Sequence, residues 1–435
     1  MNNHPLNKRL FGEASWALFG QLGSAIALLA GIRILTEQVS PEVYGQVALF
    51  SGFVALGVAL FAYPFICTGM RLLPECLHKR ERAELQSVVA RLTIRSTALA
   101  LIILAVAGGI YSYFFNDGIG LFVLAGFLLV VTVRREFGVQ LLIGERRQRE
   151  ASLWQTIDSI LRPCFAIALV ELWGAKAGWV LFGYILASIV SNLIGSIIHG
   201  RAGDESPHPI SVSSLKREIW AYALPLIPME LLYWVNGLGE RYIIGSLMTA
   251  ADVGLYAASY TLINEAFNRS SMVLLRIFQP VYFQSVSSKD TKEGFNILWI
   301  WIACVAALGI TGVTAIYFLK DWVAFLLLSK TYHEAILLMP AIGIGCALHA
   351  LGTVLAQPLL ADKQTSSMLI GRLCGAVTAI IVIPVMVTHY GLLGAAMANP
   401  IYFGVEAIAL GLLAKPWRIN KTEHVDDLIL AEEEI

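Results

Sequence analysis

The sequence predicts an all-α integral membrane protein of about twelve transmembrane helices, arranged in two six-helix lobes with a central inter-lobe cavity. Three observations lead to this fold class: the apolar composition, the series of long apolar segments, and the one-sided charge of the connections between them. Hydrophobic residues make up 57% of the 435 residues and charged residues only 14%, against an average near 25% charged. With a mean hydropathy of +0.69, the chain has too few charges to cover the surface of a soluble protein.

The apolar segments are long enough to cross a bilayer, whose core requires about 20 apolar helical residues. The first segment follows Lys8 and Arg9 and has no A-x-A cleavage site, so we expect a retained span and not a signal peptide. The predicted spans are 12–35, 42–69, 88–114, 118–142, 153–173, 177–199, 218–247, 252–284, 294–318, 332–361, 365–389 and 391–414.

Lysine and arginine in the connections indicate how the spans are oriented. Twenty of them, from Lys8 to Lys421, fall on one side of the predicted membrane, and only Lys176, Lys320 and Lys330 fall on the other. Because cytoplasmic loops carry the excess of positive charge, both termini are predicted to be cytoplasmic. The net charge is zero, and no nucleic-acid partner is predicted.

The longest connection divides the chain into two halves of six spans each. We expect an N-terminal lobe over 1–203, a cytoplasmic linker over 204–217, a C-terminal lobe over 218–414 and an acidic cytoplasmic tail over 415–435. Several features recur at an offset near 208 residues. Arg33 corresponds to Arg241, Arg71 to Arg276 and Arg162 to Arg372. Two repeats of six spans are parallel and place their shared pathway between the halves.

Ionisable residues inside the predicted spans are the candidate substrate-binding residues. Each costs about 2.5–3.5 kcal/mol on insertion scales, so it normally faces a cavity or a partner. The candidates are Arg33, Arg162, Glu230, Arg241, Glu265, Arg269, Arg276 and Arg372.

Two interpretations of this set remain open. In one, Glu265 and Arg269 neutralise each other at i,i+4, and Arg33, Arg241 and Arg276 extend to the lipid head groups. In the other, which we favour, the set lines a water-filled basic cavity that receives an anion. Arginine binds phosphate through two parallel hydrogen bonds, which suits it to binding an anion in such a cavity.

Motifs for several other classes of protein are absent from the sequence. There is no Walker A, HExxH or CxxC pattern, so neither a cofactor nor a metal is predicted. No predicted external loop is large enough to hold a catalytic domain. We therefore expect a transport protein and not an enzyme.

The stretch "RILTEQVSPEVYGQVALF" joins the first two spans and contains a helix-start signal. Ser40 can cap a helix, Pro41 suits its first position, and Glu42 suits the positive end of its dipole. We expect the second span to begin here.

With its continuation to "GMRLLPE", this stretch resembles the N-terminal signature of the bacterial polysaccharide-unit flippases. These belong to the multidrug/oligosaccharidyl-lipid/polysaccharide (MOP) exporter superfamily, whose O-antigen members are called Wzx. Further similar segments are "SLWQTIDSILRP", "AADVGLYAASYTL" and "GLLGAAMANPIYFG", and the resemblance covers essentially the whole chain.

The resemblance implies a multi-pass protein of the bacterial cytoplasmic (inner) membrane. Such a protein would flip an undecaprenyl-pyrophosphate-linked oligosaccharide from the inner to the outer leaflet by alternating access, for O-antigen, capsule or exopolysaccharide synthesis. Its partners would be the lipid-linked substrate, the lipid bilayer, a coupling proton or Na⁺, and other glycan-assembly membrane proteins. Arg162, Arg269, Arg276 and Arg372 would contact the head group, and Glu230 and Glu265 would pair with them or bind the coupling ion.

Other functions are kept as alternatives. A multidrug and toxin extrusion antiporter of the same superfamily should carry deep carboxylates in its N-terminal lobe, where this sequence has few. A membrane-bound polysaccharide polymerase or ligase would need a large external loop. A scaffold in a glycan-assembly complex would leave the intramembrane arginines unexplained.

Overall fold

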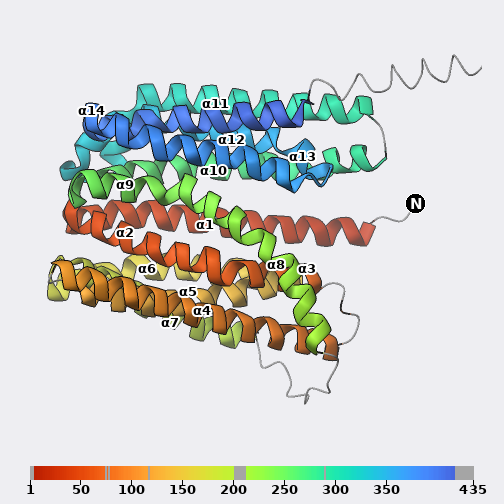
Figure 1. Cartoon of the computed structure of the whole chain (residues 1–435), viewed down its shortest axis with the longest axis horizontal. Coiled ribbons are helices and arrows are strands. Elements are labelled where there is room, and N and C mark those ends of the chain that lie inside the picture. The colour runs from red at the N-terminus through yellow and green to blue at the C-terminus, as the bar shows by residue number, and fades with distance from the viewer. Residues whose placement is uncertain are drawn as a thin grey trace, which may run out of the picture. The chain divides into compact units, whose positions relative to one another are not determined.

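The computed structural model describes residues 4–73, 76, 79–115, 118–199, 212–288 and 291–416, and in this part of the chain all regular secondary structure is helical (Figure 1). The sequence-based fold class, an all-α membrane protein with about twelve spans, is confirmed.

The first half of the chain forms long helices with one irregular span. Its elements are α1 (His4–Gln38), α2 (Pro41–Gly57), the π-helix η1 (Val58–Ala62), α3 (Tyr63–Leu72), α4 (Lys79–Phe115), α5 (Ile119–Gly144), α6 (Gln148–Trp173) and α7 (Ala177–His199). The predicted second span is therefore a continuous helical segment with a π-helical turn near its middle.

The second half repeats this pattern of long helices and also has a π-helical turn in its first span. Its elements are α8 (Val212–Trp234), the π-helix η3 (Val235–Gly239), α9 (Glu240–Leu247), α10 (Ala250–Ser287), α11 (Thr291–Leu327), the 3₁₀ helix η4 (Lys330–Leu338), α12 (Met339–Leu355), α13 (Gln357–Ala361) and α14 (Thr365–Ala414).

Each predicted span corresponds to a helical segment, although length and apolar composition alone select eight candidate spans among the described residues. One of the eight, α14, is kinked at Gly391 and contains the two last predicted spans. The φ of 58° and ψ of −141° at this position are accessible only to glycine at low cost. The segments not selected are α5, α8 with α9, and α10. All three carry several ionisable residues, which lowers the mean hydropathy of these segments.

Local signals fix where two of the helices begin. Ser40 caps α2 by accepting a hydrogen bond from the backbone N–H of Val43, with Pro41 in the first turn, as the sequence predicts. Thr249 and Asp252 form a capping box at the start of α10. Both signals satisfy backbone N–H groups that a helix end leaves without partners.

The helices separate into two packed units. The first contains Met1–Trp234 with Leu327–Thr331, and the second contains Val235–Leu326 with Tyr332–Ile435. Helix α8 packs on α3 and α4 inside the first unit, although it follows the predicted linker and was expected to begin the C-terminal lobe. The lobe boundaries stay a prediction. Residues 204–211 of the predicted linker and 417–435 of the predicted tail lie outside the described residues.

Small residues let the helices of the first unit approach closely. Helix α6 packs along both α1 and α7. At the α6–α7 crossing, a Cβ on Gly183 would lie 2.6 Å from the Cα of Ala166. Close backbone packing of this kind supplies the van der Waals contact that holds membrane helices together.

Replacing Gly183 by valine is therefore expected to lower the free energy of unfolding by about 1–3 kcal/mol, because the added atoms force α6 and α7 apart. Thermal unfolding of the detergent-solubilised variant, followed by tryptophan fluorescence, measures the effect. The control is Gly109→Val on α4, where an added Cβ meets no atom within 4 Å. Equal melting temperatures for the two variants would contradict this packing.

Candidate functional site

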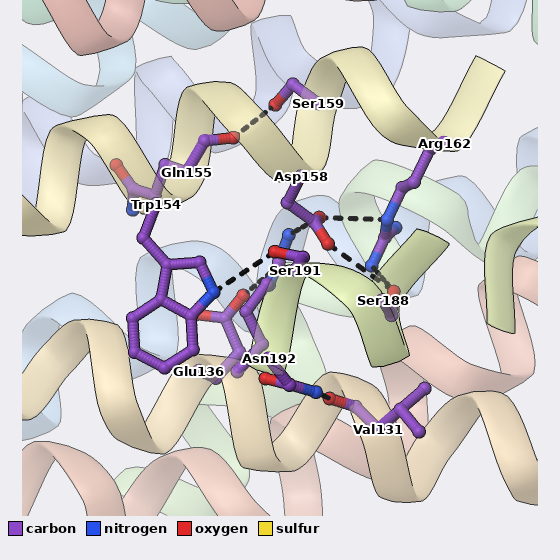
Figure 2. A network of polar contacts seen from close by, with 11 residues as sticks. Val131, Glu136, Trp154, Gln155, Asp158, Ser159, Arg162, Ser188, Ser191 and Asn192 are labelled. Carbon is purple, nitrogen blue, oxygen red and sulfur yellow. Dashed lines mark hydrogen bonds and ion pairs between the residues drawn. The ribbon is translucent and has the colours of Figure 1, made fainter. Parts of the chain in front are cut away.

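A buried network of ionisable groups lies in the first unit, where α5, α6 and α7 meet (Figure 2). Asp158 on α6 is its centre and is 0% exposed. Its Oδ2 atom pairs with Arg135 Nη1 from α5 and lies 2.9 Å from Arg162 Nε, one turn further along α6. Arg135 also pairs with the neighbouring Glu136. Two guanidinium groups thus converge on one buried carboxylate.

Neutral side chains of α7 complete this network. Ser188 Oγ donates to Asp158 Oδ1 at 3.4 Å and accepts from Arg162 Nη2 at 3.3 Å. Nearby, Trp154 Nε1 donates to Ser191 Oγ at 3.1 Å, and Asn192 Nδ2 donates to the carbonyl oxygen of Val131 at 2.9 Å (Figure 2). These bonds tie the three helices together around the charged groups.

The charges of this network balance, with two arginines against Glu136 and Asp158. Pairing of this kind is what allows ionised groups to remain inside a membrane span. The Nε–H of Arg135 has no hydrogen-bond acceptor among the described residues, and the Arg162 side chain is 27% exposed. The Arg135 guanidinium group therefore keeps one donor without an acceptor among the described residues, and the Arg162 guanidinium group is partly exposed.

The second unit contains a buried ion pair between the two parts of α14. Arg372 Nη1 lies 2.8 Å from Glu406 Oε1, and the two side chains are 2% and 1% exposed. Asn236 Nδ2 of η3 donates to Glu406 Oε2 at 3.1 Å. His349 Nδ1 of α12 lies 3.9 Å from Glu406 Oε1. Side chains from the first and fourth spans of the second half, Asn236 and His349, thus also lie against this pair.

A second buried carboxylate of this unit, Glu240 on α9, is held by neutral donors. It accepts hydrogen bonds from Tyr402 Oη at 2.8 Å and from Asn399 Nδ2 at 3.2 Å, both on α14. Asn399 Nδ2 also lies 2.6 Å from Tyr256 Oη on α10. Glu240 is fully enclosed by α9, α10 and α14.

Arg241 is the buried arginine whose contacts are weakest. Its Nη2 donates to Thr261 Oγ1 at 3.4 Å, and its guanidinium carbon lies 5.9 Å from the centre of the Tyr260 ring. Within the described part of the chain it makes no ion pair with a carboxylate at 4 Å or less, and its Nε–H has no acceptor. Arg241 is buried, and its role as a substrate-binding residue stays a prediction.

The remaining predicted site residues have different surroundings. Glu265 and Arg269 form the predicted i,i+4 pair on α10, with Nε and Oε2 2.8 Å apart. Arg33 pairs with Glu37 at 2.7 Å and donates to the carbonyl oxygen of Leu328 at 2.9 Å. Glu230 is half-buried on α8, and Arg276 is exposed on α10. Four of the six predicted arginines, Arg33, Arg162, Arg269 and Arg372, thus have a carboxylate partner.

Several residues of these networks were missed by the sequence analysis. Arg135 is one of the twenty lysines and arginines that were assigned to the connections, but α5 continues to Gly144 and brings it to α6. Asp158 precedes Arg162 by one helical turn, a spacing that could have identified it. The partners of Glu240 lie about 160 positions away in the sequence, and no local pattern reveals them.

Solved structures with similar folds are membrane transporters. An inward-facing multidrug resistance MATE family transporter of the MOP superfamily superimposes with a TM-score of 0.69 at 14% identity, covering 94% of this chain and 99% of that one. Lipid II flippase MurJ, in an inward closed conformation, gives 0.65 at 15% identity, covering 98% and 93%. A MOP superfamily transporter from Pyrococcus furiosus, described as having a binding pocket of reverse polarity, gives 0.52 at 15% identity, covering 94% and 93%.

The helical fold of this multi-pass membrane protein is thus similar to the fold of these MOP superfamily transporters. The sequence pattern of the family described as polysaccharide biosynthesis protein matches residues 34–337, which is more than half of the chain. The chain therefore belongs to the polysaccharide biosynthesis protein family. Among curated proteins, none matches it.

Proposed function

We propose that this protein is a flippase for an undecaprenyl-pyrophosphate-linked oligosaccharide repeat unit. It moves the unit from the inner to the outer leaflet of the bacterial cytoplasmic membrane by alternating access of its two lobes. The product serves the synthesis of O-antigen, capsule or exopolysaccharide. The observation that carries this proposal is the set of arginines inside the spans of a polysaccharide biosynthesis family member, among them Arg162, which is 27% exposed beside Asp158, and Arg241, whose Nε–H has no acceptor among the described residues.

The chemistry of the head group explains why such residues are useful. A pyrophosphate and its sugars do not enter hydrocarbon without polar partners, because burying an unpaired charge is very costly. Arginine donates several hydrogen bonds in a fixed planar geometry that fits phosphate oxygens. In this proposal the head group engages Arg162, Arg269, Arg276 and Arg372, with Arg33 and Arg241 also lining its path.

The carboxylates that pair with these arginines make binding of the head group reversible. When Arg162 turns toward a phosphate, Asp158 keeps Arg135 as its partner, so no carboxylate is left alone. Glu230 and Glu265 either pair with arginines or bind a coupling proton or Na⁺. Other glycan-assembly membrane proteins would supply the substrate and consume the product. By the charge of the loops, both termini are cytoplasmic.

A second candidate is export of organic cations, as in a multidrug and toxin extrusion antiporter. The observation in its favour is Glu240, a buried carboxylate that is held by neutral donors and has no ion pair among the described residues. A cationic substrate could use such a group. The family match to polysaccharide biosynthesis proteins favours the flippase.

Binding of a lipid-linked substrate distinguishes the two candidates. A short polyprenyl-pyrophosphate oligosaccharide should raise the melting temperature of the purified protein, and an organic cation should not. Arg241→Gln should weaken binding about tenfold to a hundredfold, because a hydrogen bond to a charged group contributes about 1.5–3 kcal/mol. The control is Arg91→Gln, an exposed arginine of α4 that bonds to the carbonyl oxygen of Ser87. Stabilisation by the cation alone would overturn the proposed function.

A further inference from the structure

An apolar groove lies on the first unit, at the end where α2, α5 and α7 begin and α6 ends. It has a volume of about 540 Å³, which is within the range of about 300–1,000 Å³ for small-molecule sites. Its walls are apolar side chains of these helices, including Val43, Leu121, Leu124 and Phe182. None of the charged networks described above contributes to it.

Two polar residues line this groove, and only one of them is charged. Gln46 lies on α2, and Lys176 lies in the short connection between α6 and α7. Lys176 forms no ion pair with any described residue. Glu42 is next to Val43 in the sequence but does not line the groove. The groove therefore offers an apolar channel with one ammonium group.

Aromatic rings border the groove on the side of Lys176. Trp179 lines it and stacks on Trp173 across the connection, with ring centroids 5.1 Å apart. Trp179 also meets Phe182 edge-on at 6.3 Å. Tryptophan is enriched at the level of the lipid head groups, where its polar N–H and apolar ring are both satisfied. Lys176 lies between these two tryptophans in the sequence, beside rings that suit the level of the lipid head groups.

We propose that this groove is a binding site for an anionic phospholipid. An acyl chain occupies the apolar channel, and the phosphate of its head group contacts the ammonium group of Lys176. The charge of the groove selects this occupant, because a zwitterionic lipid gains less from one uncompensated lysine than an anionic lipid does. The site does not depend on which substrate the protein transports.

Lipid retention by the full-length protein tests this site. The purified protein would be exchanged into detergent with phosphatidylglycerol or phosphatidylcholine of identical acyl chains, and native mass spectrometry would measure the bound lipid. Wild-type protein should retain phosphatidylglycerol preferentially. Lys176→Gln should reduce this retention about fivefold, the effect of one basic residue near a lipid surface. Lys320→Gln, which changes a lysine of α11, is the matched control.

A second variant blocks the groove without changing charge. A Cβ on Gly178 would lie 3.7 Å from Leu124 and 3.9 Å from Leu121, so a phenylalanine there has room to extend into the groove. Gly178→Phe should reduce retention of both lipids, whereas Gly109→Phe should not. Equal retention of both lipids by wild type, with no effect of Lys176→Gln, would overturn the proposal. Retention of a polyprenyl phosphate in place of phosphatidylglycerol would also overturn it, and would assign the groove to a carrier lipid.

Discussion

Replacing Asp158 by asparagine is expected to lower the free energy of unfolding by about 3–5 kcal/mol, the usual cost of removing one partner from a buried ion pair. Asp158 is completely buried and pairs with both Arg135 and Arg162. Its loss leaves two guanidinium groups among α5, α6 and α7 with Glu136 as their only carboxylate in the network. The variant should also transport poorly, because Arg162 loses the group that orients it.

The matched control is Glu37→Gln, which removes the carboxylate partner of Arg33. These two side chains are 48% and 32% exposed, and a pair of this kind contributes only about 0–1 kcal/mol. Thermal unfolding of the three purified proteins in one detergent gives the comparison. Should Asp158→Asn unfold at the same temperature as Glu37→Gln, the network would not hold the first unit together.

Replacing Glu406 by glutamine is expected to destabilise the second unit by a similar amount, about 3–5 kcal/mol. The change removes the carboxylate that lies 2.8 Å from Arg372, and both side chains are almost completely buried. Asn236 also loses a charged acceptor. Glu265→Gln is the control, because the Glu265–Arg269 pair is partly exposed.

A double variant separates stability from transport. Arg372→Met combined with Glu406→Leu replaces both members of the pair by apolar side chains, which is often neutral or stabilising for buried pairs. Its melting temperature should therefore return close to that of wild type. Transport should stay impaired, since the proposed head-group contact of Arg372 is gone. Wild-type transport rates in the double variant would remove Arg372 from the proposed site.

Much of the fold could be predicted because its signals are local. Membrane helices need long apolar segments, and the chain shows them from 12–35 to 391–414. Ser40 and Pro41 mark a helix start through side-chain and ring geometry that depends only on neighbouring residues. The kink at Gly391 was predicted as a break between two spans, since the pattern of apolar residues is the same for two helices and for one kinked helix.

The candidate site could be predicted only in part, for a physical reason. An arginine in an apolar segment, such as Arg162 or Arg372, is conspicuous by itself. Its partner is conspicuous only when it lies within one helical turn, as Glu265 does for Arg269. Glu406 lies 34 positions after Arg372, and their pairing depends on the kink of α14. Whether a charge is compensated depends on partners that are distant in the sequence. Composition does not reveal these partners.

Leaflet-resolved transport in proteoliposomes tests the central proposal most directly. Purified protein is reconstituted with a labelled polyprenyl-pyrophosphate oligosaccharide, and the labelled head groups on one leaflet are counted over time, with organic-cation efflux measured in parallel. The proposal predicts flipping by wild type, strong loss in well-inserted Arg269→Ala and Arg276→Ala variants, and no cation efflux. Cation efflux without flipping by wild type would contradict it.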